Sequence, residues 1–416
     1  MSRASFARTI AILAIWTAVG PLPDRAEAIE PANPHASEQA RVVLNYLAGL
    51  PSRDAQRVLS GQYVCAAVVA PEQADQVVGD TETCYQRDIV GLHASTGKWV
   101  ALVGGDYGRL GRTLWRLDLA RTNGPLLTHW QRGGLVTITW HARNPWTDGD
   151  ARDKRIPGSF DELLTEGNPV HVAWMQELGR IASALDELQQ AGVVVLWRPL
   201  HESNEPSAFW WCAGRADSPT PEQLRQLWRQ MFRYFTEQRH LNNLLWVYAA
   251  TPKEKIGALP ELQTYPGSDV VDVVGFDVYA DILELGSYEA LLALDKPVGL
   301  TEFGPSGVVA EEHSYNYLRL IQQIRDRYPR FCFVQCWSSS GRPGTKAWEL
   351  VAHRNAGLFL RDPWIVTASG DGRQPWRDVA AAMAAAQPTT PTPILTHHRR
   401  RAKHLLRGSA NDQKKQ

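Results

Sequence analysis

Short apolar segments alternate with longer amphipathic segments along most of the chain. Eight of the short segments are rich in β-branched and aromatic residues and have the length of buried parallel strands. They cover residues 58–64, 99–105, 135–141, 193–201, 244–248, 271–279, 298–302 and 331–337. Because strands of this kind are apolar on both faces, they predict a sheet whose two faces are covered by other parts of the chain.

Segments with helical periodicity lie between or after these strands, at 170–190, 221–238, 315–327 and 376–385. The first ends at Ala191-Gly192, a C-cap signal, and the second follows Thr220, a preferred N-cap, with Pro221 at the first helical position. Eight strands separated by helices predict an α/β protein with a (β/α)8 TIM-barrel fold. The alternative is a doubly wound open sheet, which is disfavoured because no GxGxxG sequence follows an early strand.

The composition is that of a globular protein. Of 416 residues, 44% are hydrophobic and 21% are charged, which excludes a mostly disordered, collagen-like or coiled-coil chain. The 44 basic and 44 acidic residues cancel, so no net field favours nucleic acid as a partner. The 16 Trp residues are a large number, and they suit either a core or the lining of a sugar-binding cleft.

Both ends of the chain differ from the middle. The first 28 residues have the pattern of a cleaved export signal: two Arg residues, then an apolar run over 10–19, then Ala26-Glu27-Ala28 as a cleavage site. The alternatives are an uncleaved anchor or a core helix. Export implies a periplasmic or extracellular protein. Residues 387–416 are Thr/Pro-rich and then basic, which predicts a disordered tail or, alternatively, a segment that binds an acidic polymer or the envelope surface.

These boundaries leave residues 29–386 as one catalytic domain. No segment outside 1–28 reaches the roughly 18 apolar residues that a membrane span needs. The chain has five Cys residues, an odd number, and the spacing favours a disulfide between Cys65 and Cys84. No Cys or His cluster has the spacing of a zinc site, so we expect neither a metal nor a cofactor.

Catalytic groups of a barrel lie at the carboxyl ends of its strands. Six of the eight predicted strands end in polar or aromatic residues. These ends are Asp106-Tyr107, Trp140-His141, Arg198 to Glu202, Asp277 to Tyr279, Glu302 and Gln335 to Trp337. Any one of them could be structural, but their convergence on one rim predicts a functional site.

Glu202 and Glu302 carry the chemical argument. Each follows an apolar run, where an unpaired charge would be costly to bury, and each alone could be a salt-bridged structural residue. Together, on the fourth and seventh strands, they match a retaining glycosidase, which needs an acid and a nucleophile about 5–5.5 Å apart. The two pKa values must then differ, and Arg198, His201 and Tyr279 are candidates to stabilise an anionic partner.

A family resemblance supports this interpretation. The segment Arg198-Pro199-Leu200-His201-Glu202-Ser203-Asn204, followed by Phe209-Trp210-Trp211, resembles the fourth-strand signature of glycoside hydrolase family 26. Segments 140–145, 275–279 and 300–304 agree with that family, and 60–62 and 105–107 agree more weakly. The resemblance covers roughly residues 40–385. Most members of the family are endo-β-1,4-mannanases that carry catalytic glutamates on the fourth and seventh barrel strands.

The resemblance implies a role for each residue. Glu202 is expected to be the acid/base and Glu302 the nucleophile. Arg198, His201 and Tyr279 are expected to orient Glu302 and stabilise its charge, and Asp106 is expected to support the site. Among the substrate contacts, Trp337 is expected to lie under the cleaved sugar, and His141 and Asp277 to contact hydroxyl groups. Trp210 or Trp211 is expected to stack on a neighbouring sugar.

The chain also departs from the family pattern. Ser203-Asn204-Glu205 stands where mannanases have Met-Asn-Gly, so that Glu205 either raises the pKa of Glu202 by repulsion or points to solvent. Cys212-Ala213 also separates the Trp pair from Gly214, whereas mannanases tend to have Gly directly after the Trp pair. Both changes lie where the leaving-group sugars are expected to bind, and they leave the substrate open.

The predicted function is a secreted, monomeric, retaining endo-β-glycanase, first of all an endo-β-1,4-mannanase acting on a polysaccharide. The alternatives within the family are a lichenase, a β-1,3-xylanase or an exopolysaccharide-trimming glycosidase. A carbohydrate-binding protein without catalysis is a further alternative. A Ser-His-Asp hydrolase has little support, because no GxSxG sequence follows a strand.

Overall fold

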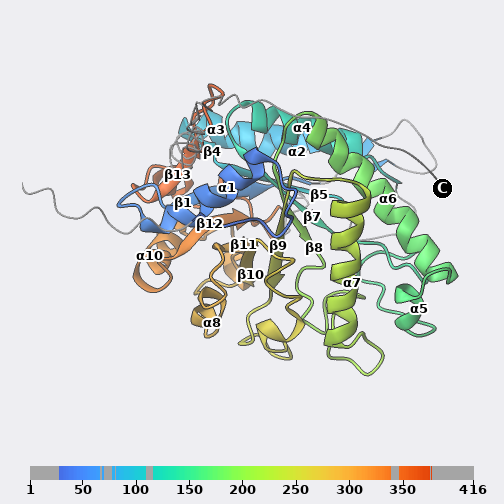
Figure 1. Ribbon diagram of the computed structural model, residues 1–416. Helices are drawn as coiled ribbons and strands as arrows, with labels where there is room; N and C mark the ends of the chain where they lie inside the picture. The colour runs from blue at the N-terminus through green and yellow to red at the C-terminus, as the bar shows by residue number, and fades with distance from the viewer. Residues whose placement is uncertain are drawn as a thin grey trace, which may run out of the picture.

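The computed structural model describes residues 28–65, 68–69, 77–79, 81–108, 116–338, 346–374 and 376. Eight parallel strands form a closed barrel (Figure 1). They are β1 (Val58–Tyr63), β5 (Leu102–Asp106), β7 (Leu135–Trp140), β8 (Val195–Pro199), β9 (Leu244–Ala250), β10 (Val273–Tyr279), β11 (Val298–Gly304) and β12 (Phe331–Cys336). The barrel closes where β12 pairs with β1, and Leu59 lies opposite Phe333. The TIM-barrel prediction is confirmed and the open-sheet alternative is wrong.

All eight predicted strands are present, and the barrel strands are buried almost throughout their length. The segment predicted at 99–105 divides into β4 (Trp99–Val100) and β5. β4 pairs antiparallel with β13 (Ile365–Ala368), and β13 in turn pairs in parallel with β1. The sequence pattern cannot reveal this division, because the apolar run is continuous and only the choice of pairing partner separates its two parts.

Three of the predicted helices are found with well-formed starts. α6 (Pro169–Gln190) begins after Asn168, whose side chain accepts from the backbone of Val170. α7 (Pro221–Arg233) begins with a full capping box between Thr220 and Gln223 and continues as π-helix over Tyr234–Gln238. α10 (Tyr317–Arg327) starts two residues later than predicted, because Asn316 caps it. Except for Trp376, the predicted helix at 376–385 lies outside the described residues.

The remaining elements cover the barrel and build its rim. The helices are α1 (Glu38–Gly49), α2 (Thr81–Tyr85), α3 (Gly91–Thr96), α4 (Leu119–Gln131), α5 (Asp161–Leu164), α8 (Tyr288–Leu292), α9 (Gly307–Glu311) and α11 (Ala356–Phe359). 3-10 turns lie at Leu50–Ser52, Glu261–Thr264 and Leu350–Ala352, and Gln86–Val90 is π-helical. A small sheet contains β2 (Val68–Val69), β3 (Val77–Gly79) and β6 (Arg116–Leu117).

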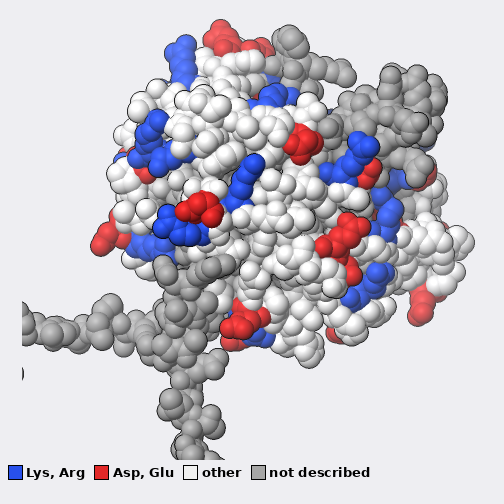
Figure 2. Space-filling model, turned by 90° about the horizontal axis from the view of Figure 1, so that it is seen from above, with Lys and Arg blue, Asp and Glu red and all other residues white. Residues whose placement is uncertain are grey.

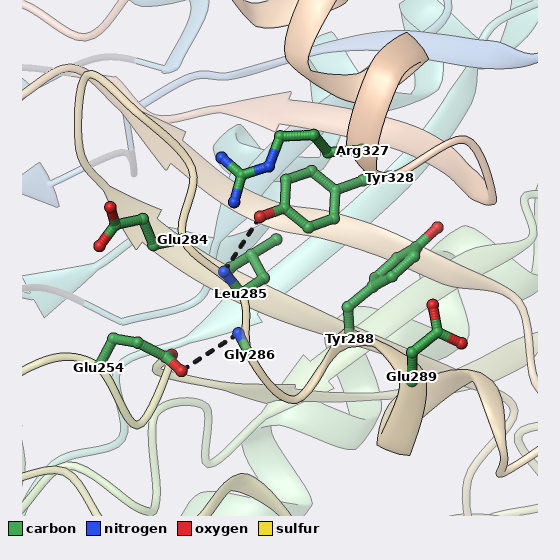
Figure 3. A pocket seen from close by; sticks show the side chains of 8 residues that line it. All are labelled: Glu254, Glu284, Leu285, Gly286, Tyr288, Glu289, Arg327 and Tyr328. Carbon is green, nitrogen blue, oxygen red and sulfur yellow. Dashed lines mark hydrogen bonds between the residues drawn. The ribbon is translucent and has the colours of Figure 1, made fainter.

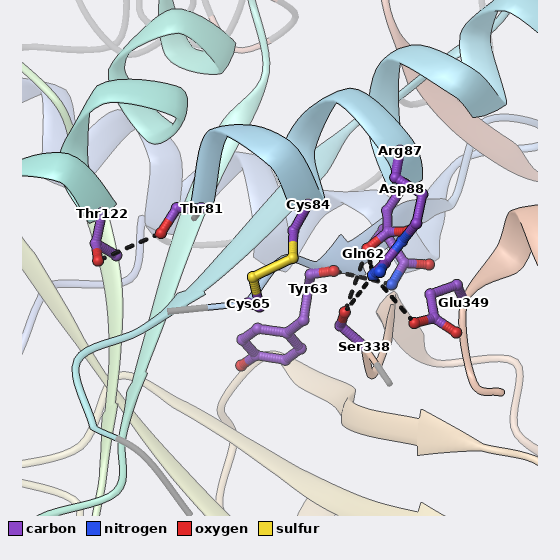
Figure 4. Close-up of a disulfide and its surroundings, with 10 residues drawn as sticks. All are labelled: Gln62, Tyr63, Cys65, Thr81, Cys84, Arg87, Asp88, Thr122, Ser338 and Glu349. Atoms are coloured by element: carbon purple, nitrogen blue, oxygen red, sulfur yellow. Dashed lines mark hydrogen bonds and ion pairs between the residues drawn. A yellow bond between two sulfur atoms is a disulfide. The ribbon is translucent and has the colours of Figure 1, made fainter. Parts of the chain in front are cut away.

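The predicted disulfide is confirmed. Cys65 and Cys84 are joined, with Cα atoms 5.8 Å apart, so the chain after β1 is fixed to α2 (Figure 4). Next to it, the guanidinium of Arg87 pairs with Asp88, which also accepts from the hydroxyl of Ser338 at 3.2 Å. These contacts join the segments after β1 and β12 on one side of the barrel rim.

The two terminal predictions are left untested. Residues 1–27 of the predicted signal segment and all of the predicted tail, 387–416, lie outside the described residues. Within the described part of the chain, no helix has the length and apolar character needed to cross a membrane.

Candidate active site

The turn after β8 presents Glu202 in a constrained backbone conformation. Leu200 and Glu202 have positive φ angles of 47° and 53°, a region that residues other than glycine seldom adopt. The backbone N–H of Glu202 donates to the carbonyl of Ala249 at 3.0 Å, and the carbonyl of Glu202 accepts from Cys212 Sγ at 3.2 Å. These contacts compensate a local strain of the kind often found at functional sites.

Glu302 reaches the same rim from β11. It is the register partner of Asp277 in β10, and the pairing shifts by one residue between Phe276 and Asp277. The extra residue is Thr301, whose hydroxyl donates to Asp277 Oδ1 at 2.6 Å. Such a bulge re-aims neighbouring side chains, and here it accompanies two carboxylates on adjacent strands.

Arg198 joins these carboxylates from β8. Its guanidinium is completely buried and donates to Asp277 Oδ2 at 2.6 Å and to Glu302 Oε1. Tyr279 donates its hydroxyl to the second oxygen, Glu302 Oε2, at 2.7 Å. Both oxygens of Glu302 therefore accept from donors, one of them cationic, which favours the carboxylate form that a nucleophile needs. Arg198 and Tyr279 thus contact Glu302 as predicted.

Glu202 has a different environment. Burial raises its pKa well above the usual range, and the negative charges of Asp277, Glu302 and Glu205 raise it further, while Lys255 acts in the opposite direction. One oxygen each of Glu202, Asp277 and Glu302 lies within 4.8 Å of the other two. This spacing is close to the 5–5.5 Å of retaining glycosidases and short of the roughly 6.5–9.5 Å of inverting ones.

The three carboxylates also have the spacing of metal ligands, and among the described residues they form the one such group found. However, the guanidinium of Arg198 already pairs with Asp277 and Glu302. The arrangement therefore carries its own cation and gives no specific indication of a metal.

A second polar pair lines the site next to these glutamates. Asp106 Oδ2 lies 2.7 Å from His141 Nδ1, and Asp106 Oδ1 accepts from the backbone of Gly108 at 2.8 Å. This contact orients the imidazole, whose ring lies 5.8 Å from that of Trp337. Asp106 supports His141, as a supporting residue should. A hydroxyl contact from His141 stays a prediction.

His201 does not orient the nucleophile in the way expected. Its Nδ1 is hydrogen-bonded to the hydroxyl of Thr139 at 3.2 Å, and its ring packs against His141 and Phe209. Burial, followed by the charge of Arg198, lowers the pKa of His201 well below its usual value, so the ring is neutral. We conclude that His201 forms a neutral wall of the site and leaves the nucleophile to other donors.

Two predicted sugar contacts are wrong. Trp210 and Trp211 are completely buried, and their indole N–H groups donate to the carbonyls of Ala142 and His201, both at 2.9 Å. They anchor the segment after Glu202 and present no face to a sugar. The sequence shows that both are large and apolar but not which layer they occupy.

The predicted contact of Asp277 with a sugar hydroxyl group stays a prediction. Only 2% of it is exposed, and its two oxygens are engaged by Arg198 and Thr301. Its role is to pair with the buried guanidinium. Burial raises the pKa of Asp277, Arg198 lowers it, and the nearby negative charge of Glu302 raises it further.

Trp337 fits the predicted platform. It is partly exposed, and its backbone N–H donates to Phe303 at 2.9 Å. Its ring lies 4.8 Å from that of Tyr63, whose hydroxyl accepts from Arg198 at 3.2 Å. The sequence analysis did not identify Tyr63, although the polar Gln62 inside an apolar strand was a signal. Gln62 donates to the carbonyl of Trp337 at 3.0 Å.

A separate pocket lies away from these residues (Figure 3). It is lined by Glu254, Glu284, Leu285, Gly286, Tyr288, Glu289, Arg327 and Tyr328. Glu254 and Tyr328 accept from the backbone N–H groups of Gly286 and Leu285 and so hold the loop after β10. None of the predicted site residues lines this pocket, and the catalytic arrangement is the rim built on β8, β10 and β11.

The sequence model of glycosyl hydrolase family 26 matches residues 32–369. The chain belongs to this family. It is 29% identical to a mannan endo-1,4-beta-mannosidase of Bacillus subtilis (strain 168), over 86% of this chain and 94% of the relative. It is 32% identical to mannan endo-1,4-beta-mannosidase A and B of Caldalkalibacillus mannanilyticus, over 80% of this chain and 62% of the relative.

Solved structures of the family have the same fold. The structure of a Bacillus subtilis mannanase superimposes with a TM-score of 0.68 at 27% identity, covering 82% of this chain and 96% of that one. A beta-mannanase from a symbiotic protist of the termite Reticulitermes speratus, complexed with gluco-manno-oligosaccharide, gives a TM-score of 0.60 at 25% identity, covering 82% and 97%. These structures support both the barrel and the glycoside hydrolase chemistry of the rim.

Proposed function

We propose that this glycoside hydrolase is a retaining endo-β-1,4-mannanase with Glu202 as acid/base and Glu302 as nucleophile. The observation that carries the proposal is a pair of glutamates with one carboxyl oxygen each within 4.8 Å of the other, where Arg198 and Tyr279 donate to Glu302 and burial raises the pKa of Glu202. The names of the relatives and the gluco-manno-oligosaccharide bound to a similar structure support a β-mannan substrate.

The proposed mechanism has two steps. Glu302 attacks the anomeric carbon while Glu202 gives its proton to the glycosidic oxygen, and a covalent glycosyl-enzyme forms as the leaving sugar departs. Glu202, now a carboxylate, then takes a proton from water, and the resulting nucleophile releases the sugar from Glu302. Trp337 offers its ring as a surface for the apolar face of the sugar.

We also propose that the protein acts outside the cytoplasm as a monomer. The signal-like segment 1–28 and the Cys65–Cys84 disulfide support an oxidising compartment. Figure 2 shows one face of the molecule on which basic and acidic side chains are interspersed, in keeping with an uncharged polysaccharide as partner rather than a nucleic acid.

A substrate panel tests the proposed function. Residues 29–386 are incubated with glucomannan, galactomannan, lichenan, β-1,3-xylan and β-1,4-xylan, and the products are resolved by chromatography. Short manno-oligosaccharides are expected. Products only from lichenan or a xylan would overturn the mannan assignment and retain the two glutamates. No product from any polymer would favour an exopolysaccharide substrate or the non-catalytic alternative.

A further inference from the structure

Glu205 occupies an unusual position for a charged residue. It lies three residues after Glu202, only 5% of it is exposed, and its backbone N–H donates to the carbonyl of Glu202 at 2.8 Å. Ser207 donates to Glu205 Oε1 at 2.8 Å. Thr251 and Lys255 donate to Glu205 Oε2 at 3.0 and 2.6 Å. The carboxylate is therefore fixed from two segments of the chain, the turn after β8 and the loop after β9.

The neighbouring Asn204 strengthens this connection. Its side chain donates to the carbonyls of Thr251 and Leu259 at 2.7 and 2.8 Å and accepts from the backbone of Thr251 at 3.0 Å. The turn that carries Glu202 is thus held rigidly against the loop after β9. Because this loop cannot move independently of the turn, the distance between the charges of Glu205 and Glu202 is also held.

The charge of Glu205 is only partly compensated. The carboxylate side chain is 6% exposed, whereas the side chain of its partner Lys255 is 52% exposed. A buried charge acts on its neighbours through a poorly polarisable medium, while an exposed ammonium group is screened by water. We therefore expect the pair to leave net negative potential at Glu202.

Other elements packed around Glu202 also carry titratable groups. The ones that act on it are Asp277 from β10, Glu302 from β11, Glu205 from its own turn and Lys255 from the loop after β9. Cys212 lies against its carbonyl and remains a neutral thiol, because burial raises the pKa of that thiol. Asp277 and Glu302 share the charge of Arg198, whereas the cation paired with Glu205 is the solvated Lys255.

We propose that Glu205 is a positioning residue for the acid/base: its fixed, buried charge adds to the effect of burial in holding the proton on Glu202 and so extends catalysis to higher pH. The inference rests on the proposed role of Glu202 as the acid. A glycosidase acid must be protonated to act, so kcat/KM falls as pH rises through its pKa in the free enzyme. Removing a negative neighbour lowers that pKa and moves the alkaline limb to lower pH.

The experiment compares pH profiles of kcat/KM on soluble glucomannan. Glu205→Gln keeps the size of the side chain and removes its charge, and we expect the alkaline limb to move down by about 0.5–1 pH unit. Above the limb, kcat/KM then falls about three- to tenfold relative to the unmodified protein, while the plateau at lower pH is retained. Lys255→Gln, which removes the compensating charge, is expected to move the limb upward.

Two controls separate charge from structure. Ser207→Ala removes one hydrogen bond from Glu205 without changing any charge. The alkaline limb of its kcat/KM profile is expected to stay in place. Glu205→Asp keeps the charge and is expected to restore most of the original profile. An equal loss of kcat/KM at every pH in Glu205→Gln, or an alkaline limb that stays in place in that variant, would overturn the proposal.

A measurement without turnover keeps the inference distinct from the proposed function. The carboxyl carbon of Glu202 is titrated by NMR in protein labelled with [δ-13C]glutamate, and its signal is identified by its loss in Glu202→Gln. A lower midpoint in Glu205→Gln supports the inference even if no β-mannan is cleaved. An unchanged midpoint refutes it, whichever polysaccharide proves to be the substrate. If Glu205→Gln does not fold, the titration of Glu205→Ser, which also removes the charge, decides.

Discussion

The two catalytic glutamates have the same side chain and lie on the same rim, but their surroundings are opposite. Glu302 accepts from the guanidinium of Arg198 and the hydroxyl of Tyr279, one donor on each oxygen. Among the described residues, no hydrogen bond to the carboxyl group of Glu202 is found, and three carboxylates act on it. Neighbouring donors and charges, rather than residue type, therefore divide the roles of acid and nucleophile.

This division depends on the chain around each strand end. The bulge at Thr301 accompanies the placement of Glu302 beside Asp277, so that a single arginine serves both. At Glu202 the backbone turns with a positive φ, and the backbone N–H of Glu205 donates to the carbonyl of Glu202 within the same turn.

Replacing the nucleophile should have the largest effect. In Glu302→Gln the amide cannot form the glycosyl-enzyme, so kcat on β-mannan should fall by about 10⁴-fold or more. Affinity for manno-oligosaccharides should remain within a few-fold, as measured by isothermal titration calorimetry. Full activity in this variant would remove Glu302 from the role of nucleophile.

Replacing the acid should give a loss that depends on the leaving group. In Glu202→Gln, kcat/KM on manno-oligosaccharides should fall by about 10²–10⁴-fold, because an alkoxide leaving group needs the proton. An aryl mannoside with an activated phenol needs it much less and should lose little in its first step, observed as a burst of phenol. Equal losses on both substrates would contradict the acid role.

The buried guanidinium is expected to matter for stability as well as activity. Arg198→Met leaves Asp277 and Glu302 without a cation, and the free energy of unfolding should decrease by about 3–5 kcal/mol. Chemical denaturation measures this change. The double variant Arg198→Met/Asp277→Asn should recover part of the loss, and a double variant no more stable than the single one would show that the pair is not the cause.

The two kinds of tryptophan provide the smallest and most specific contrast. Trp337→Phe should reduce kcat/KM several-fold through weaker ring contact and leave stability nearly unchanged. Trp210→Phe removes the donor to the carbonyl of Ala142, and it should lower the free energy of unfolding by about 1–2 kcal/mol with little change in KM. The reverse pattern would restore Trp210 as the sugar-stacking residue.

The sequence predicted the elements whose signal is local. Apolar runs predicted all eight barrel strands, and capping residues together with helical periodicity predicted three helices. α4 was not predicted, because Gly124 and Pro125 interrupt its pattern, and tertiary packing stabilises it nonetheless. The paired glutamates were accessible because parallel strands bring their carboxyl ends to one rim.

The parts of the site that were wrongly predicted depend on burial, which a single sequence does not encode. Trp210 and Trp211 lie near apolar runs in the same way as true rim residues do. Only the fold decides that Asp277 faces Arg198 and that the two indoles lie inside. The contact of His201 with Thr139 depends on the pairing of β7 with β8, which brings the two strand ends together.

The most direct test of the central claim is the stereochemistry of the first product. Manno-oligosaccharide hydrolysis is followed by ¹H NMR within the first minutes, before the new reducing end mutarotates. Two glutamates within 4.8 Å predict a double displacement, so the β-anomer should form first and the α-anomer should grow in later. Initial appearance of the α-anomer would mean a single displacement and would contradict the assignment of Glu302 as a nucleophile.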